Sequence, residues 1–415
     1  MGEKSLIHRL RTIFQLLGEV FLWSFVLRLK DQVTIKIESI AFGGHGIGRV
    51  DNFVVFVPFA APDDELEVEI VELKKKFARG RILKISKPSL LRNVPLCSYY
   101  ENCGGCCYQH LNYEHQLKII KKQVQDAFQK IGGIVSPPVL DPIALPVSYK
   151  YRGKAQLHAA KEASEWKLGF LDISGVKIVD IERCEIMEKT INDKIRELRK
   201  KPKLLSVESN LTIWSESPGD TLQNIDQIKR MVKGKEFSVP RGGFFQANLY
   251  LTDRLVDEVC RLVMSEKIST LVDAYCGSGL FSIFLSPYAQ NVVGIETGEQ
   301  AVKFAQMNAE RQGVRNTKFI CGEVESVLPQ EFASGAIKID LLVLDPPRSG
   351  CDVAVLKAIA ILRPQKVIYI SCNPATQARD IKYLCECGYD LLSLLPLDMF
   401  PQTEHIEVIG HLKLR

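Results

Sequence analysis

The 415-residue sequence is poor in cysteine, has little net charge and contains no low-complexity tract. Twelve cysteines are far too few for a chain held together mainly by disulfides. Lys and Arg outnumber Asp and Glu by only 54 to 49, a balance that permits an RNA partner without requiring one. Apolar residues make up 46% of the chain and charged residues 25%, which excludes a chain that is disordered over its whole length.

A long uninterrupted hydrophobic run is also missing. Residues 6–30 are rich in Leu, Ile, Val and Phe, but Glu19 divides their longest uncharged stretches. A membrane-spanning helix needs about 20 mostly apolar residues, and a signal peptide would end at small residues. We therefore favour an amphipathic helix packed on the body, or an extension without a chemical role. We expect a cytoplasmic protein without stable membrane association, whose thiols are free, liganded or catalytic.

Residues 32–87 have the pattern of a small β-barrel. Alternation of apolar and polar residues, or short apolar runs, predict strands at 33–38, 53–57, 65–71 and 80–85. The glycine-dense segment 41–49 predicts a turn. About five short strands in this length favour a closed barrel of the OB type. Its last hairpin carries a basic cluster that either contacts RNA or is a solvated tip: Lys74, Lys75, Lys76, Arg79 and Arg81.

Residues 88–240 predict a central domain of mixed α+β structure. Apolar residues recur every three or four positions over 113–131, which predicts a helix that Gly132 and Gly133 end. Prolines between 137 and 146 mark a connecting segment. Six of the ten residues 194–203 are basic, which indicates either a second RNA contact or a solvated helix face.

From about residue 269, short apolar runs alternate with helical stretches. The runs lie at 270–275, 291–296, 317–321, 339–345 and 366–371. This alternation predicts a parallel, doubly wound sheet of the Rossmann-like α/β class. The expected organisation is therefore an extension (1–31), a barrel (32–87), a central domain (88–240) and a doubly wound domain (241–415).

A glycine loop follows the first of these runs. It spans residues 273–279, and Glu296 closes the next run, where an acid can accept hydrogen bonds from both ribose hydroxyls. Ligands of such sheets bind at the carboxyl ends of the strands. Because the loop lacks the G-x-G-x-x-G spacing of a dinucleotide site, S-adenosylmethionine is favoured over a nicotinamide or flavin cofactor.

Three further motifs follow later runs. An Asp-Pro-Pro-Arg motif occupies 345–348, where amino-group methyltransferases have an aromatic residue in place of Arg348. RNA cytosine-5 methyltransferases place a cysteine directly after such a proline pair, which this sequence does not. A Ser-Cys-Asn-Pro motif at 371–374 puts Cys372 at a strand end, either as a nucleophile or as a small buried hydrophobe. The segment 398–407 then supplies three acids and a histidine.

Four cysteines form a separate constellation: Cys97, Cys103, Cys106 and Cys184. Four thiolates suit tetrahedral zinc or an iron–sulfur cluster. Structural zinc sites usually consist of two short pairs, which this spacing lacks. Free core thiols are the remaining interpretation, although Gly104 and Gly105 within the segment favour a chelating loop. Cys107 is expected to be a bystander.

Together these motifs resemble the RNA uracil-5 methyltransferase family. The Phe-Phe-Gln-Ala-Asn segment at 244–248 is similar to the motif that precedes the sheet in that family, and the resemblance covers about residues 32–415. It implies that Cys372 is the nucleophile that attacks C6 of a flipped uridine and that Glu407 is the general base. It also implies S-adenosylmethionine contacts at Gln246, Tyr275, Glu296, Glu323 and Asp345. Leu280 departs from the family, since several relatives have Asn there.

The resemblance extends to the two N-terminal regions. It implies that Cys97, Cys103, Cys106 and Cys184 hold a [4Fe-4S] cluster and that residues 32–87 form a TRAM domain, an RNA-binding barrel. Barrel plus cluster is the layout of the 23S ribosomal RNA branch, whereas the tRNA branch typically lacks both. We therefore expect a monomer that acts on ribosomal RNA and not on DNA.

Two alternatives remain at this point. Radical S-adenosylmethionine enzymes also combine a TRAM barrel with a cluster, but they need a Cys-x3-Cys-x2-Cys motif, and the spacing here is x5 and x2. A non-catalytic RNA-binding factor would have no need for Cys372 and Glu407. The same methyl transfer on tRNA is a third possibility.

Overall fold

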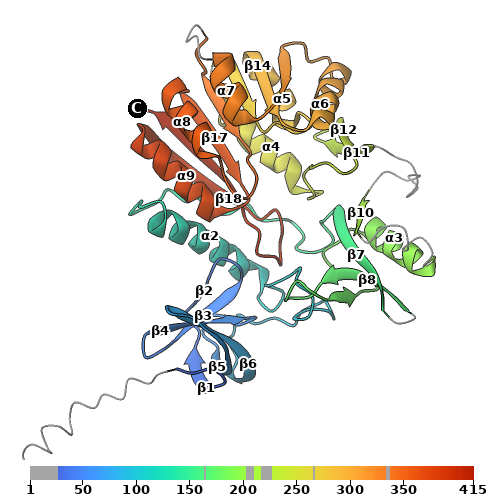
Figure 1. The fold of residues 1–415 in the computed structure, drawn as a ribbon, viewed down its shortest axis with the longest axis vertical. Coiled ribbons are helices and arrows are strands. Elements are labelled where there is room, and N and C mark those ends of the chain that lie inside the picture. The colour runs from blue at the N-terminus through green and yellow to red at the C-terminus, as the bar shows by residue number, and fades with distance from the viewer. Residues whose placement is uncertain (1–26, 163–164, 202–209, 216–226, 265–266, 333–336) are drawn as a thin grey trace, which may run out of the picture. The chain divides into compact units, whose positions relative to one another are not determined.

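The computed structural model describes residues 27–162, 165–201, 210–215, 227–264, 267–332 and 337–415 (Figure 1). It divides into two compact units: residues 27–41 with 45–90, and residues 42–44 with 91–415. The helix expected within residues 6–30 falls almost wholly outside the described residues, as does the end of the basic run at 194–203. Among the described residues, no helix is long and apolar enough to cross a membrane.

The first unit is a sheet of six strands in the order β1-β5-β6-β4-β3-β2. The alternation seen in the sequence has its expected effect, because Leu66, Val68 and Ile70 all point into the core. The strands are β1 (Gln32–Lys36), β2 (Ser39–Ile40), β3 (His45–Val50), β4 (Phe53–Pro58), β5 (Glu65–Leu73) and β6 (Phe77–Lys87).

The prediction of a turn through residue 49 is wrong, because β3 already begins at His45. Gly46 and Gly48 lie inside that strand and serve close packing. A Cβ on Gly46 would come within 2.7 Å of the Ala60 Cβ, and one on Gly48 within 2.9 Å of the Lys36 carbonyl oxygen. Glycine in a strand can therefore mark a close approach of backbone as well as a turn.

The second unit starts with an irregular cysteine-bearing segment that leads into α2 (Tyr113–Lys130). The helix predicted over 113–131 is confirmed to within one residue, and the Asn112 side chain caps it by accepting from the His115 amide (3.1 Å). A four-stranded sheet of order β10-β7-β8-β9 and a β11–β12 hairpin follow. Their elements are β7 (Lys154–Glu162), β8 (Glu165–Leu171), β9 (Ile178–Asp180), α3 (Lys189–Lys200), β10 (Asn210–Trp214), β11 (Gln227–Val232) and β12 (Lys235–Pro240).

The C-terminal sheet has the order β15-β14-β13-β16-β17-β19-β18. The Rossmann-like class is confirmed, and the first five strands are parallel. The sheet is not wholly parallel, however, because β19 is antiparallel to both its neighbours and β18 was not predicted. The strands are β13 (Ile268–Ala274), β14 (Ala289–Glu296), β15 (Thr317–Cys321), β16 (Leu341–Leu344), β17 (Lys366–Ser371), β18 (Tyr389–Leu397) and β19 (Glu407–Leu414).

Helices cover both faces of this sheet (Figure 1). Leu271 faces one core with α4, α5 and α6, and its neighbour Val272 faces the other with α2, α7, α8 and α9. The central strands are therefore buried on both sides, which explains their apolar runs. The helices are α4 (Leu251–Arg261), α5 (Leu280–Leu285), α6 (Glu299–Arg311), α7 (Val324–Phe332), α8 (Val353–Leu362) and α9 (Pro374–Glu386).

Candidate active site

The glycine loop follows β13 at the carboxyl edge of the sheet. Tyr275, Gly277 and Gly279 have φ of 68°, 54° and 86°, so the chain turns sharply before α5. No atom lies within 4 Å of a Cβ built on Gly277, so there is open space beside the backbone. The Glu296 carboxylate, at the end of β14, accepts from the Gly277 amide (3.1 Å) and the Gly298 amide (2.8 Å).

Two carboxyl groups lie beneath this loop. Oδ2 of the buried Asp273 accepts from the Ser282 amide (2.8 Å) and hydroxyl (2.6 Å). Burial raises the pKa of Asp273 to about 7. Asp345 is half-buried, and desolvation of its carboxylate together with Asp273 raises its pKa to about 7 as well. Within the described part of the chain, Asp273 Oδ1 and the Ser278 hydroxyl have no hydrogen-bond partner.

The remaining predicted cofactor residues lie around the same edge. Tyr275 and Asp345 directly follow β13 and β16, and Glu296 is the last residue of β14, which is adjacent to β13. Glu323 follows β15, one strand further out, and is exposed. Gln246 is buried in the segment that leads into α4.

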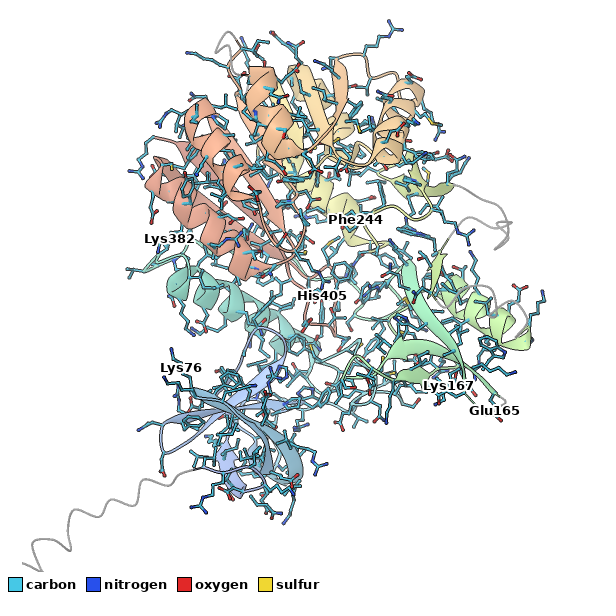
Figure 2. The ribbon with its side chains drawn as sticks, in the orientation of Figure 1. Lys76, Glu165, Lys167, Phe244, Lys382 and His405 are labelled. Atoms are coloured by element: carbon cyan, nitrogen blue, oxygen red, sulfur yellow. The ribbon has the colours of Figure 1, made fainter. Side chains whose placement is uncertain are left out.

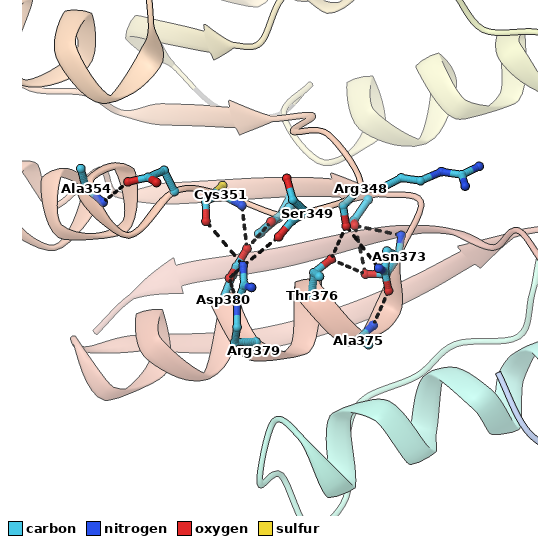
Figure 3. Close-up of polar contacts among 12 residues, drawn as sticks. Arg348, Ser349, Cys351, Ala354, Asn373, Ala375, Thr376, Arg379 and Asp380 are labelled. Atoms are coloured by element: carbon cyan, nitrogen blue, oxygen red, sulfur yellow. Dashed lines mark hydrogen bonds and ion pairs between the residues drawn. The ribbon is translucent and has the colours of Figure 1, made fainter. Parts of the chain in front are cut away.

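Cys372 lies between the end of β17 and the start of α9. Asn373 caps α9 by accepting from the Ala375 amide (3.0 Å), and its Nδ2 donates to the Arg348 carbonyl (3.2 Å), which fixes the cysteine beside the 345–348 motif (Figure 3). Burial, and to a lesser extent Glu407, raises the pKa of the Cys372 thiol to about 11, while Arg348 opposes the shift. The thiol therefore needs help to become a thiolate.

Glu407 is buried at the first position of β19. In the antiparallel β17–β19 pairing Ser371 lies opposite Val408, so the next residues, Cys372 and Glu407, are neighbours across the two strand ends. Burial and the Asp345 carboxylate raise the pKa of Glu407 well above its usual value, and Arg348 lowers it. The structure thus brings the two predicted reactive side chains together from separate strands.

The loop 398–406, between β18 and β19, carries His405 (Figure 2). Arg348 Nη2 lies 3.1 Å from His405 Nε2. Burial and the positive charges of Arg348 and Arg152 lower the pKa of His405 to about 4, so the imidazole is neutral at pH 7. The imidazole therefore adds no second positive charge beside Arg348.

Sequence reasoning missed the residues that hold these motifs in place. Asp380 on α9 is fully buried, and its Oδ2 accepts from the Cys351 amide (2.9 Å) and the Tyr369 hydroxyl (2.6 Å), just after the 345–348 motif (Figure 3). Gln116 on α2 is also buried and bonds Gln402 of the 398–406 loop. An acid or amide on the apolar face of a predicted helix is the signal that could have found both.

The four predicted cluster cysteines line one cavity of about 240 Å³. Burial raises the pKa of each thiol, that of Cys184 to about 12. Other thiols of the set contribute to the raised pKa values of Cys103, Cys106 and Cys184. Among the described residues, no three His, Cys, Asp or Glu side chains surround a common point as ligands of a single ion. A [4Fe-4S] cluster binds one thiolate at each of four separate irons, so it does not require three ligands around one point. Four thiols around one cavity are the donor set that such a cluster takes.

Most of the basic residues predicted to contact RNA are paired with acids. On the barrel, glutamates of β5 face cations of β6, as in Arg81–Glu69 (2.6 Å) and Arg79–Glu72 (3.2 Å). Lys74 also pairs with Glu72 (2.8 Å). Lys75 and Lys76 are exposed at the hairpin tip (Lys76 is labelled in Figure 2), and neither forms an ion pair with a described residue.

The basic run at 194–203 is similarly balanced where it is described. Arg199 pairs with Asp180 (2.5 Å) and Lys201 with Glu197 (2.7 Å). Lys194 donates to the Trp214 carbonyl (3.0 Å). These contacts favour the interpretation of a structural helix face over an RNA contact.

Comparison with known proteins gives two matching family models. The tRNA (uracil-5-)-methyltransferase model matches residues 184–414, and the TRAM domain model matches residues 30–83. An uncharacterized RNA methyltransferase of Clostridium tetani is 32% identical over 90% of this chain and 95% of its own. One from Halalkalibacterium halodurans is 30% identical over 93% of this chain and 97% of its own.

Among solved structures, this chain is similar to the Pyrococcus abyssi tRNA (uracil-54, C5)-methyltransferase in complex with S-adenosyl-L-homocysteine. The TM-score is 0.69 and the sequence identity 26%, over 91% of this chain and 100% of that chain. The similarity therefore covers far more than the C-terminal sheet.

Proposed function

This chain belongs to the tRNA (uracil-5-)-methyltransferase family, and from that membership we propose that it methylates C5 of an RNA uridine through a covalent bond to Cys372. It is an S-adenosylmethionine-dependent RNA methyltransferase with an N-terminal TRAM domain. The observation that carries the covalent mechanism is the neighbouring placement of Cys372 and Glu407 at the ends of β17 and β19.

The first step makes C5 reactive. C5 of uracil is a poor nucleophile, so Cys372 Sγ attacks C6, forms a C6–S bond and pushes an electron pair toward C5. The thiol must first lose its proton, and the Arg348 charge favours the thiolate. The uridine has to leave its stack to reach this site. When bound, S-adenosylmethionine supplies the methyl group to C5.

The second step restores the ring. Glu407 accepts the C5 proton, the C5–H electron pair reforms the C5–C6 double bond, and the C6–S bond breaks to release the Cys372 thiolate. The electron pair thus returns to sulfur and the proton remains on the carboxylate. Once it is deprotonated, Glu407 is a stronger base than an exposed carboxylate because its pKa is raised, and a stronger base accepts a carbon-bound proton more readily.

The glycine loop fits the methyl donor. Asp273 Oδ1 and the Ser278 hydroxyl are buried without partners among the described residues, and space is open beside Gly277. Glu296 accepts two amide hydrogen bonds but has lone pairs left for ribose hydroxyls. We assign the cofactor contacts to Gln246, Tyr275, Glu296, Glu323 and Asp345.

We assign Cys97, Cys103, Cys106 and Cys184 as ligands of a [4Fe-4S] cluster, on the strength of their shared cavity. With four thiolate ligands, no iron would be left open to substrate. The methyl transfer above needs no electrons, so the cluster would be structural.

The RNA substrate we propose is 23S ribosomal RNA, and transfer RNA is the second candidate. The barrel and the cysteine set support the ribosomal branch. The Pyrococcus abyssi enzyme is named for a tRNA uridine and matches 91% of this chain, which favours tRNA. Mapping 5-methyluridine in both RNA classes, from cells with and without the gene, separates the two.

Two single substitutions test the mechanism by stopping it at different steps. Cys372→Ala cannot attack C6, so it should bind RNA and form no covalent complex. Glu407→Gln keeps the thiol and the methyl donor, so it should transfer the methyl and then stall with the adduct intact. A denaturing gel with radiolabelled RNA should show a shifted band for Glu407→Gln alone.

The exposed Glu404 is the matched control for the base. Trapping by Glu404→Gln with normal turnover of Glu407→Gln would overturn the base assignment. A Cys372→Ala variant that still methylates would overturn the covalent mechanism.

A further inference from the structure

We infer that Gln116 is a positioning residue that couples the cysteine-bearing segment to the loop ending at Glu407. Gln116 lies far from the motifs of the reaction in sequence and was not singled out by any of them. The inference rests on the proposed function, because the loop matters for catalysis only if Glu407 is the base.

Gln116 is only 1% exposed and lies in the first turns of α2. Its Nε2 donates to Gln402 Oε1 (3.0 Å), and its Oε1 accepts from the Gln402 main-chain amide (3.2 Å). The same NH2 group lies within hydrogen-bond distance of the carbonyls of Leu111 (2.8 Å) and Tyr108 (3.1 Å), so its two hydrogens are shared among three acceptors. One side chain therefore joins residues 108–111, directly after the cysteines, to the 398–406 loop.

The cysteine-bearing segment holds Gln402 from a second side. The amides of Cys107 and Tyr108 both donate to the Gln402 carbonyl (2.8 and 3.1 Å). Gln402 is buried and has a φ of 71°, a left-handed conformation that is unfavourable for a residue other than glycine. Such a conformation persists only where the surroundings impose it. These contacts with residues 107–116 are what impose it here.

A displacement of Gln402 would be passed on to Glu407 through a compact loop. The Thr403 hydroxyl donates to the Phe400 carbonyl (2.8 Å) and accepts from the His405 amide (3.3 Å). Glu407 pairs with Leu397 where the loop closes between β18 and β19. Cys372 is outside the loop, at the start of α9, and its position does not depend on Gln402. Loosening the loop should therefore slow proton removal more than thiol attack.

The variant that tests this is Gln116→Met, which keeps the length of the side chain and removes its amide, both the carbonyl acceptor and the NH2 donor. The matched control is Gln123→Met on the same buried side of α2, where the amide donates to the Tyr108 hydroxyl (2.9 Å). We expect kcat of Gln116→Met to fall about tenfold, with KM for RNA unchanged, since buried hydrogen bonds to the loop are lost. The Cys372–RNA adduct should accumulate on a denaturing gel, as for Glu407→Gln.

A second measurement does not depend on turnover. Hydrogen exchange of the amides in the 398–406 loop should become faster in Gln116→Met and stay unchanged in α9 and in Gln123→Met. If Gln116→Met does not fold, Gln402→Met removes the other half of the amide pair and should trap the same adduct.

The outcomes separate this inference from the proposed function. Equal losses in Gln116→Met and Gln123→Met without adduct accumulation would show that Gln116 serves folding alone and would overturn the inference. If wild type makes no 5-methyluridine, or Glu407→Gln traps no adduct, the proposed function itself fails. If Glu407→Gln traps and neither Gln116→Met nor Gln402→Met does, only the coupling is wrong.

Discussion

At the scale of single residues, the burial that shields the reaction from water also opposes it. Burial raises the pKa of Cys372 to about 11 and that of Glu407 well above its usual value, whereas the proposed mechanism uses both groups in their deprotonated forms. Arg348 is the charge that lowers both pKa values. His405, which contacts Arg348, has a pKa of about 4 and so adds no positive charge of its own at neutral pH.

We therefore predict that adduct formation speeds up from neutral to alkaline pH. Below a raised pKa, the deprotonated fraction of Cys372 grows about tenfold per pH unit. Arg348→Met removes the charge, raises both pKa values further and should shift the profile to higher pH, whereas Arg348→Lys should stay close to wild type. The rate of adduct formation on RNA, followed across pH, checks this. Superimposable profiles for Arg348→Met and wild type would contradict it.

At the scale of elements, side chains of helix α9 hold the segment after β16 in place through hydrogen bonds. Its Asp380 accepts from Cys351 and Tyr369, and Arg379 Nε donates to the second oxygen of Asp380 (2.7 Å) (Figure 3). Thr376 donates to the Arg348 carbonyl (3.2 Å). The 345–351 segment and Cys372 are thus fixed by one helix, although they come from different strands.

Asp380→Asn should disrupt these hydrogen bonds while leaving the volume of the side chain nearly unchanged. The substitution replaces one carboxylate oxygen of Asp380 with an NH2 group. At least one of the groups that donate to Asp380, from Cys351, Tyr369 or Arg379, then faces a donor and loses its hydrogen bond. We expect a loss of about 1–3 kcal/mol in the free energy of unfolding and a lower kcat. Asp390→Asn, at an exposed pair with Arg415, is the control and should cost little. Urea unfolding of both variants measures the difference, and equal stabilities would contradict the prediction.

Strands whose burial shows as an apolar run were predictable from the sequence. The pairing of strands with neighbours distant in sequence was not. The predicted strands 317–321 and 366–371 match β15 and β17 residue for residue. Every residue of β17 is buried, and a strand buried on both faces reads as an apolar run, whereas β15 is a partly buried edge strand. β18 was not predicted, and β19 is antiparallel to both β17 and β18. The residues of a strand do not indicate which strand it pairs with or in which direction. Cys372 and Glu407 were predicted from motifs, whereas Gln116 bonds a residue 286 positions away, which no motif indicates.

At the scale of the whole molecule, two regions outside the sheet carry the remaining predictions. The cysteine cavity is one of them, and the four cysteines that we assign as ligands come from a loop at 97–106 and from Cys184. The barrel is the other, and its charges are mostly paired within its own sheet. Both regions should affect binding or folding without supplying a reacting group.

The cluster assignment predicts iron in the purified protein. Under anaerobic purification we expect a brown protein with about four irons per chain. Cys103→Ala removes a ligand and should lose the iron and its visible absorbance. Cys107→Ala is the matched control in the same cavity and should retain both. Iron and acid-labile sulfide assays measure this, and stoichiometric zinc without iron would overturn the assignment.

The barrel should bind RNA through its unpaired cations rather than through its ladder of ion pairs. Lys75 and Lys76 are exposed without a described acidic partner, whereas Lys84 and Lys87 of β6 face Glu67 (3.6 Å) and Glu65 (3.3 Å). Each phosphate contact adds about 1 to the slope of log affinity against log salt. Lys75→Ala with Lys76→Ala should therefore lower that slope by about 2, and Lys84→Ala with Lys87→Ala, an equal change of charge, by much less. Binding titrations at several salt concentrations decide between them. Equal reductions would mean that the barrel acts through its overall field, and a wild-type slope in both variants would leave the hairpin a solvated tip.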